Sequence, residues 1–114
     1  MFRLFVVTKR NPSLTMEQFI EHYENIHVPM NKRLYPQMQR YVRNYLKPVD
    51  ADMPSDAEAP FDCITEAYFN SEADFRSVLT DMATNTENTA EHLEDEEKLF
   101  DRSRVWWFTS ETRE

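Results

Sequence analysis

The chain has no glycine in its 114 residues, and this absence restricts what it can fold into more than any other feature of the sequence. Glycine is the residue that adopts positive φ without strain and lets a backbone approach a ligand closely. Dinucleotide-binding folds, P-loops and nucleophile elbows each need glycine at fixed positions. The sequence therefore excludes nucleotide-binding enzymes of these kinds.

The size and charge of the chain exclude further classes of protein. Its 114 residues, 40% of them hydrophobic, suit one domain over 1–114 with a single core. The net charge of -8 repels polyphosphates, so we expect neither a nucleic-acid nor a membrane partner. The lone Cys63 cannot form an internal disulfide, and the apolar start meets Lys9 too soon for a signal peptide. We expect a cytoplasmic protein.

Hydrophobic spacing predicts an alternation of strands and helices. The predicted elements are, in order, a strand over 2–8, a helix from Met16, strands over 39–47 and 62–69, a helix after Ser71, a helix over 86–99 and a strand over 104–109. A long loop with Pro48, Pro54 and Pro60 separates the two middle strands. This order indicates an α+β fold of the ferredoxin-like, split βαβ type, with a four-stranded antiparallel sheet and one additional helix.

The first helix has clear start and stop signals. Thr15 and Gln18 have the spacing of a capping box at its beginning. Pro29 lacks an amide hydrogen and crowds the carbonyl group four residues before it, so the helix is expected to end or kink there. His27 would then lie beside a weakened turn.

Both faces of the sheet are predicted to be apolar. In the last strand Trp106 and Phe108 oppose Val105 and Trp107, and the first strand alternates in the same way. Helices in this connectivity cover one face, so the other face predicts a homodimer packed sheet against sheet. The alternative is that one set of apolar residues is tolerated at an edge or under the long loop.

His27 is the leading candidate for chemistry. It lies in an apolar helical stripe one turn after Tyr23, whose phenol could hydrogen-bond and orient the imidazole. A histidine in an apolar pocket can act as a general acid or base near neutral pH. The alternative is a core histidine that satisfies a carbonyl freed at the kink.

Metal and nucleophile sites find little support. His22 and His27 lie about 140° apart around a helix and cannot share a metal, so no metal site is predicted. A calcium loop starting at Asp50 fails because Pro54 occupies its fifth position and no glycine stands at its sixth. Cys63 has acidic neighbours in the sequence and is interpreted as a packing residue.

The distribution of charged and aromatic residues suggests a ligand site, and each of these features also has a purely structural explanation. Residues 25–49 carry five bases and no acid, whereas 50–101 are strongly acidic. The basic segment could guide an anionic ligand or could pair with the acidic helix. Candidate residues for stacking an aromatic ligand are Tyr41, Tyr45, Tyr68, Trp106 and Trp107, which could equally be core residues.

Several motifs resemble those of the EthD family, within the dimeric α+β barrel superfamily. The most specific is EHYENIHVPM over 21–30, with the His-x-Pro signature at His27 and Pro29, and further matches extend over nearly the whole chain. The resemblance implies the same fold and dimer, with substrates bound between sheet and helices. The sequence departs from the family pattern over 11–13, which lacks the usual glycine, at Cys63, and at Tyr45, where some members have a second histidine.

The resemblance and the residues together predict a small cofactor-independent enzyme. We expect proton-transfer chemistry, such as cyclisation, dehydration, isomerisation or decarboxylation, on an apolar oxygenated aromatic, polyketide-like or lactone metabolite. His27 would move the proton with Tyr23 orienting it, and Tyr45 or Glu66 would hold the substrate oxygen or act as the partner acid. The competing hypothesis is a non-catalytic protein that binds a small hydrophobic compound in support of an oxygenase or a degradation pathway.

Overall fold

Four antiparallel strands form a single sheet in the order β2-β3-β1-β4 in the computed structural model, which describes residues 1–49 and 59–114. The strands are β1 (Phe2–Arg10), β2 (Arg40–Tyr45), β3 (Cys63–Phe69) and β4 (Phe100–Phe108). This is the strand order of a ferredoxin-like fold, so the predicted α+β class is confirmed. The middle of the proline-containing loop, with the rejected calcium site, lies outside the described residues.

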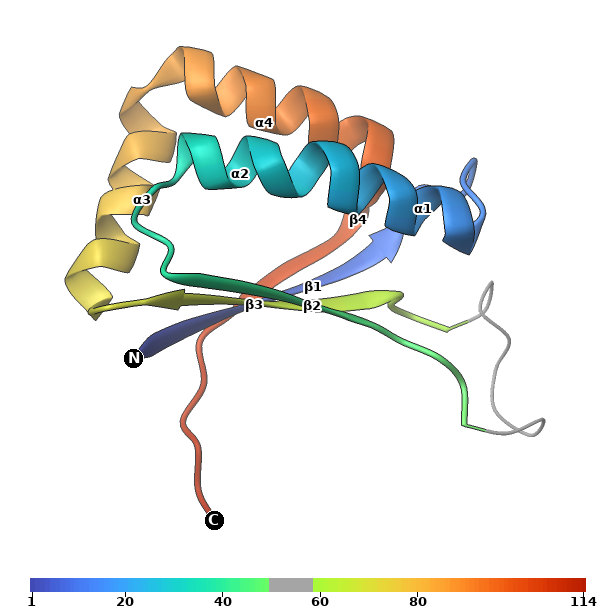
Figure 1. Ribbon diagram of the computed structural model, residues 1–114, viewed down its shortest axis with the longest axis horizontal. Coiled ribbons are helices and arrows are strands. Elements are labelled where there is room, and N and C mark those ends of the chain that lie inside the picture. Colours follow the sequence, from blue (N-terminus) through green and yellow to red (C-terminus); the bar gives the residue numbers. More distant parts are fainter. Residues whose placement is uncertain (50–58) are drawn as a thin grey trace.

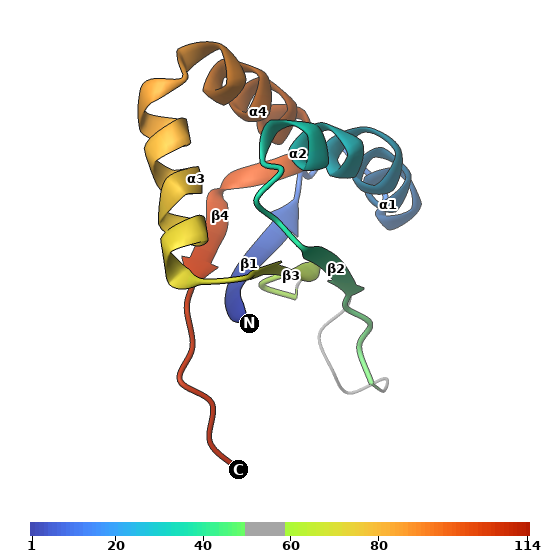
Figure 2. The ribbon, with the colours of Figure 1, turned by 60° about the vertical axis from the view of Figure 1, so that its left-hand side comes forward.

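The helices all lie on one face of this sheet (Figure 1). The first helical segment comprises α1 (Met16–His22), the π-helical turn η1 (Tyr23–His27) and α2 (Val28–Leu34), and the second half of the chain supplies α3 (Glu72–Thr84) and α4 (Thr86–Leu99). Figure 2 shows α4 beside α2, and the two helices are in contact. The predicted capping box of Thr15 and Gln18 is present at the start of α1.

Of the two outcomes expected at Pro29, an end or a kink, the end does not occur, because the helix continues to Leu34. The reason lies in η1, where the amide of Val28 donates to the carbonyl of Tyr23, five residues earlier. This wider turn precedes Pro29, which occupies the first turn of α2, where a missing amide hydrogen is tolerated. The result is a continuous helix whose π-helical turn ends at His27.

Strand β4 starts at Phe100, four residues before the predicted start. Its first part pairs with Arg10 of β1 after a register shift between Thr8 and Arg10, which sequence alternation alone does not reveal. No described residue has a positive φ, as expected for a chain whose turns contain no glycine. The turn after β1 is held instead by Asn11 Oδ1, which accepts from the amide of Ser13 at 3.0 Å.

The helix-facing side of the sheet carries the core. Buried side chains at alternate positions of β3 include Cys63, Thr65, Ala67 and Phe69. The pairing of β1 with β4 shows which of their residues face the helices. Val6 and Trp107 lie opposite each other on the helix side, and Val7 and Trp106 lie opposite each other on the open side. The open side therefore carries an apolar patch, which we call the open-face patch and which comprises Phe5, Val7, Ile64, Trp106 and Phe108.

Candidate active site

His27 is the last residue of η1, and its imidazole is buried between the helices and the sheet with 2% of its surface exposed. Its Nδ1 lies 2.8 Å from Oδ2 of Asp95 on α4, and its Nε2 lies 3.0 Å from Nδ2 of Asn31, one turn later on α2. The ring is therefore held on both sides by side chains. Neither nitrogen satisfies a backbone carbonyl freed near Pro29, which was the structural alternative.

The expected hydrogen bond from Tyr23 to His27 is wrong. The Tyr23 hydroxyl lies 2.6 Å from Oγ1 of Thr65 on β3, and the Tyr23 ring meets the imidazole edge-on with centroids 5.2 Å apart. Burial raises the pKa of Tyr23 well above its ordinary value, so the phenol stays neutral. Tyr23 packs against the imidazole, and Asp95 orients it.

Asp95 links His27 to a second, more exposed histidine. Its other oxygen, Oδ1, lies 2.8 Å from Nε2 of His22 on α1. Burial acts to raise the pKa of Asp95, but the hydrogen bonds from His27 and His22 outweigh it and hold the pKa below its ordinary value. Burial lowers the pKa of His27, and the bond to Asp95 opposes this shift without cancelling it. Asp95 is thus an anion beside a histidine that burial favours in its neutral form.

A third histidine, His92, contacts the side-chain amide of Asn31 at the atom that does not face His27. Nδ1 of His92 on α4 lies 2.9 Å from Oδ1 of Asn31, and its Nε2 lies 2.8 Å from Glu96. Burial acts to raise the pKa of Glu96, but the hydrogen bond and charge of His92, with the charge of Arg102, bring it below the usual value. The chain of polar contacts runs from His22 through His27 and Asn31 to Glu96.

A small cavity adjoins this group. It has a volume of about 30 Å³, and its lining combines polar groups with aromatic rings: Val6, Tyr23, His27, Asn31, Tyr41, His92, Glu96, Phe100, Val105 and Trp107. This volume suits one water molecule or one small polar group. Tyr41 reaches it with a hydroxyl that accepts from Asn31 at 3.1 Å. Burial raises the pKa of Tyr41, which keeps this hydroxyl available as a hydrogen-bond donor.

A larger groove of about 610 Å³ lies outside this cavity, between α4 and the segment η1–α2. It is open, and its rim is charged, with Arg33, Glu91, Glu94 and Lys98. Asp95, which contacts both His22 and His27, is one of the residues that line this groove. His27 and Tyr41 line the smaller cavity and not this groove. Arg33 pairs with Glu91, so part of the basic segment does pair with the acidic helix.

Tyr45 lies on the helix side of the sheet but outside the cavity. Its hydroxyl donates to Glu24 at 2.5 Å, and Arg43 holds the other oxygen of Glu24 at 2.7 Å. The hydrogen bond from Arg43 is the largest effect that lowers the pKa of Glu24. This ion-paired group joins β2 to η1.

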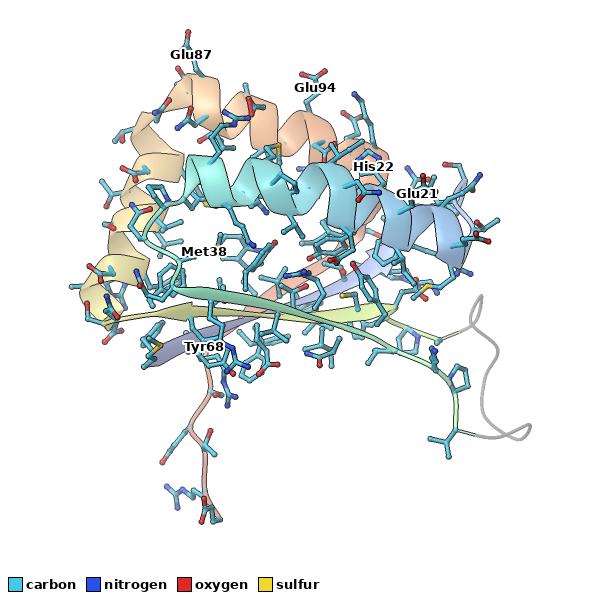
Figure 3. All side chains as sticks on the ribbon, in the orientation of Figure 1. Glu21, His22, Met38, Tyr68, Glu87 and Glu94 are labelled. Carbon is cyan, nitrogen blue, oxygen red and sulfur yellow. The ribbon has the colours of Figure 1, made fainter. Side chains whose placement is uncertain are left out.

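The remaining predicted ligand residues, Glu66, Tyr68 and Trp106, lie on the open face of the sheet. Glu66 accepts from Arg3 and from Tyr68, each at 3.1 Å, and Figure 3 shows Tyr68 on the side away from the helices. Trp106 stacks on Phe108 with ring centroids 5.9 Å apart. The sheet separates these three residues from His27, so they do not form one site with it.

The partners of His27 were not predicted from the sequence. Asp95, His92, Glu96 and Asn31 were not singled out, although a signal was present. His92, Asp95, Glu96 and Leu99 have the spacing of one helical face, and Leu99 marks that face as buried. Asn31 follows His27 by four residues, which places both on one side of the helix. Of the two tryptophans predicted to stack a ligand, Trp107 lines the cavity and Trp106 does not.

Two further properties concern the described residues alone. Across 1–49 and 59–114, no group of three or more His, Cys, Asp or Glu side chains is arranged to hold a metal ion. Within the same ranges, none of the helices combines the length and the apolar character needed to cross a bilayer. Cys63 is buried, and burial raises its pKa to about 12, in agreement with a packing role.

Comparison with known proteins agrees with the fold and the sequence motifs. The family model described as the EthD domain matches residues 11–103. No curated protein matches the sequence. Among solved structures, an EthD family protein from Bacillus halodurans is 19% identical with a TM-score of 0.65, covering 99% of this chain and all of the other. HapK from Hahella chejuensis is 14% identical with a TM-score of 0.61, covering 97% of this chain and 92% of its own.

A third solved structure adds information on assembly. It is described as a dimeric ferredoxin-like protein of unknown function from Thermobifida fusca, and it is 13% identical with a TM-score of 0.53. The alignment covers 96% of this chain and 90% of the other. At these identities the structures support the fold, while the family model spans most of the sequence. The chain therefore belongs to the EthD family.

Proposed function

We propose that the protein is a cofactor-independent enzyme that moves a proton next to a carbonyl group of an apolar, oxygenated aromatic or lactone-like metabolite. The observation that carries this proposal is the buried His27, paired with Asp95 at 2.8 Å and facing a cavity lined by aromatic rings. A carboxylate on Nδ1 fixes the tautomer of an imidazole, so that Nε2 carries the lone pair. Nε2 is the nitrogen on the Asn31 side.

The proposed chemical step uses two cavity groups. Asn31 Nδ2 must first release the lone pair of His27 Nε2. His27 Nε2 then takes a proton from the carbon beside the substrate carbonyl, the electron pair of the broken C–H bond forms an enolate, and Tyr41 donates a hydrogen bond to the enolate oxygen. Return of the proton to another carbon gives isomerisation, whereas loss of a β-hydroxyl gives dehydration. Attack of the enolate on a second carbonyl gives cyclisation. All three need the same two residues.

Substrate entry requires the cavity to grow, since about 30 Å³ accepts only the reacting end of such a molecule. We propose Trp107 as the residue that moves. It lines the cavity and is 37% exposed, so its indole stands between the cavity and solvent. It also belongs to the edge strand β4, where a side chain has fewer neighbours than in the centre of the sheet.

The direct test is proton exchange in D₂O with compounds that carry an acidic C–H beside a carbonyl. β-Tetralone and α-angelica lactone represent the two substrate classes, and NMR follows the loss of the C–H signal. The proposal expects exchange faster than with an equal concentration of free imidazole. Binding of both probes, seen as shifts of backbone amide signals, without any acceleration would overturn the enzymatic role and favour a binding protein.

We further propose that the protein is a homodimer in which a second copy covers the open-face patch. Trp106 and Phe108 are 53% and 45% exposed there, which is a large exposed apolar surface for a monomer. The relative from Thermobifida fusca is described as dimeric and has the same fold. A two-fold axis would bring this patch against itself, burying both copies at once.

Substituting Trp106 by Glu is expected to produce a monomer, because two carboxylates would meet across the two-fold axis in a desolvated interface. Light scattering at micromolar concentration should give twice 13.7 kDa for the natural chain and 13.7 kDa for Trp106→Glu. Leu93→Glu is the matched control, since Leu93 is an exposed apolar residue of α4, on the helix side. A monomeric natural chain, or a monomer produced by Leu93→Glu instead, would contradict the proposed interface.

A further inference from the structure

The side-chain amide of Asn31 bridges two buried histidines. Nδ2 of Asn31 lies 3.0 Å from Nε2 of His27, and Oδ1 lies 2.9 Å from Nδ1 of His92. Asn31, His27 and His92 are 6%, 2% and 8% exposed, so solvent does not supply alternative partners. The far nitrogen of each imidazole contacts a carboxylate, Asp95 for His27 and Glu96 for His92, both at 2.8 Å.

The hydrogen atoms of this arrangement can be counted. A carboxylate is an acceptor, so the nitrogen that faces Asp95 and the nitrogen that faces Glu96 must each carry a hydrogen. On the other side, Nδ2 of Asn31 is a donor and requires a lone pair from the imidazole it faces. Oδ1 is an acceptor and requires a hydrogen. One of the two histidines must then be neutral and the other must be an imidazolium.

Rotating the amide by 180° exchanges Nδ2 and Oδ1 and so exchanges the two protonation states. Tyr41 permits either orientation, because a hydroxyl that accepts from Nδ2 can equally donate to Oδ1. In one orientation His27 is neutral and His92 is the imidazolium. In the other, His27 is the imidazolium and His92 is neutral.

We propose that His27, Asn31 and His92 hold one shared proton, and that rotation of Asn31 moves the charge between the two imidazoles. His27 is then a base in one orientation and an acid in the other, and His92 is the residue that stores the proton in between. Asn31 and His92 are positioning residues. The catalytic use of these two histidines rests on the proposed function, whereas the inference that they share one proton does not.

The surrounding groups disfavour both the addition of a second proton to the two histidines and the loss of the shared one. A second proton would place two imidazolium rings with centroids 5.6 Å apart in a buried site. Loss of the shared proton would place the Asn31 carbonyl oxygen against an imidazole nitrogen with no hydrogen between them, whichever way the amide is turned. The titratable and charged groups around the pair come from every neighbouring element: Tyr23 of η1, Tyr35 after α2, Tyr41 of β2, Asp95 and Glu96 of α4, Arg102 of β4, and His22 of α1 through Asp95.

The test is NMR of the full chain with ¹⁵N-labelled histidine, which distinguishes neutral tautomers from imidazolium through the ring nitrogen shifts. At pH 7.5 the proposal expects one imidazolium in total for His27 and His92, and a titration in which the two residues respond to each other. Assignment uses His22→Gln, which removes the third histidine signal and leaves the bridge intact. Two neutral rings, or two imidazolium rings, at this pH would overturn the proposal.

Two variants of Asn31 are expected to change the number of imidazolium rings in opposite directions. Asn31→Asp presents acceptors to both rings, so two imidazolium rings are expected, whereas Asn31→Leu removes the acceptor and no imidazolium is expected. Circular dichroism and the remaining amide signals report whether each variant folds, and the natural chain alone suffices if one does not. The same count in both folded variants as in the natural chain would contradict the bridge. A count of one with no proton exchange on either probe would leave the bridge standing and remove the enzymatic role.

Discussion

Replacing His27 by Gln is expected to slow proton exchange on the responsive probe by about 10² to 10⁴, the usual contribution of a positioned acid or base. Glutamine can still hydrogen-bond to Asp95 and Asn31, but its amide does not titrate near neutral pH. The loss should therefore appear in kcat, with binding of the probe nearly unchanged. The rate of C–H signal loss in D₂O and the shifts of backbone amides during titration measure the two quantities separately.

The matched control is Tyr45→Phe. It removes one hydrogen bond between η1 and β2, the 2.5 Å bond to Glu24, which lies outside the cavity. We expect it to keep the exchange rate of the natural chain. A His27→Gln protein that exchanges protons at the natural rate would disprove the assigned role. One that melts early and loses binding and turnover together would show that His27 has a structural role.

The strands, helices and two-sided sheet could be predicted because they depend on local spacing. The capping box at Thr15 and the alternation of β3 are both encoded in a few consecutive residues. The continuation of the helix through Pro29 could not be predicted in the same way. It depends on η1, whose i to i+5 hydrogen bond has no clear sequence pattern.

The candidate site was predicted in part. His27 stood out from its position in an apolar stripe, but its partner Asp95 is 68 residues away in the chain. α4 appeared simply acidic because six of its fourteen residues are Asp or Glu and they were not sorted by helix face, so the buried face of His92, Asp95 and Glu96 was not recognised. Trp106 and Trp107 alternate clearly in the sequence. Which of the two faces the helices depends on the pairing of β4 with β1, a long-range property.

Asp95→Asn is expected to lower kcat by about 10²-fold or more, although Asn has almost the same shape. The amide can donate from its Nδ2 to Nδ1 of His27, which favours the tautomer that carries its hydrogen on Nε2, and that tautomer cannot take a proton there. The variant should also be less stable, by about 1.5–3 kcal/mol, since Asp95 accepts from two histidines. Urea unfolding measures this second effect.

Asp95→Asn is also expected to change the pH dependence of kcat, which a simple loss of packing would not do. Burial already lowers the pKa of His27, and the hydrogen bond and charge of Asp95 act in the opposite direction. Removing the carboxylate should lower this pKa further, so the rise of kcat with pH should shift to lower pH. Glu94→Gln is the matched control, because it removes a neighbouring carboxylate that points to solvent on the same helix (Figure 3). If both variants keep the natural rate and pH profile, Asp95 does not position His27.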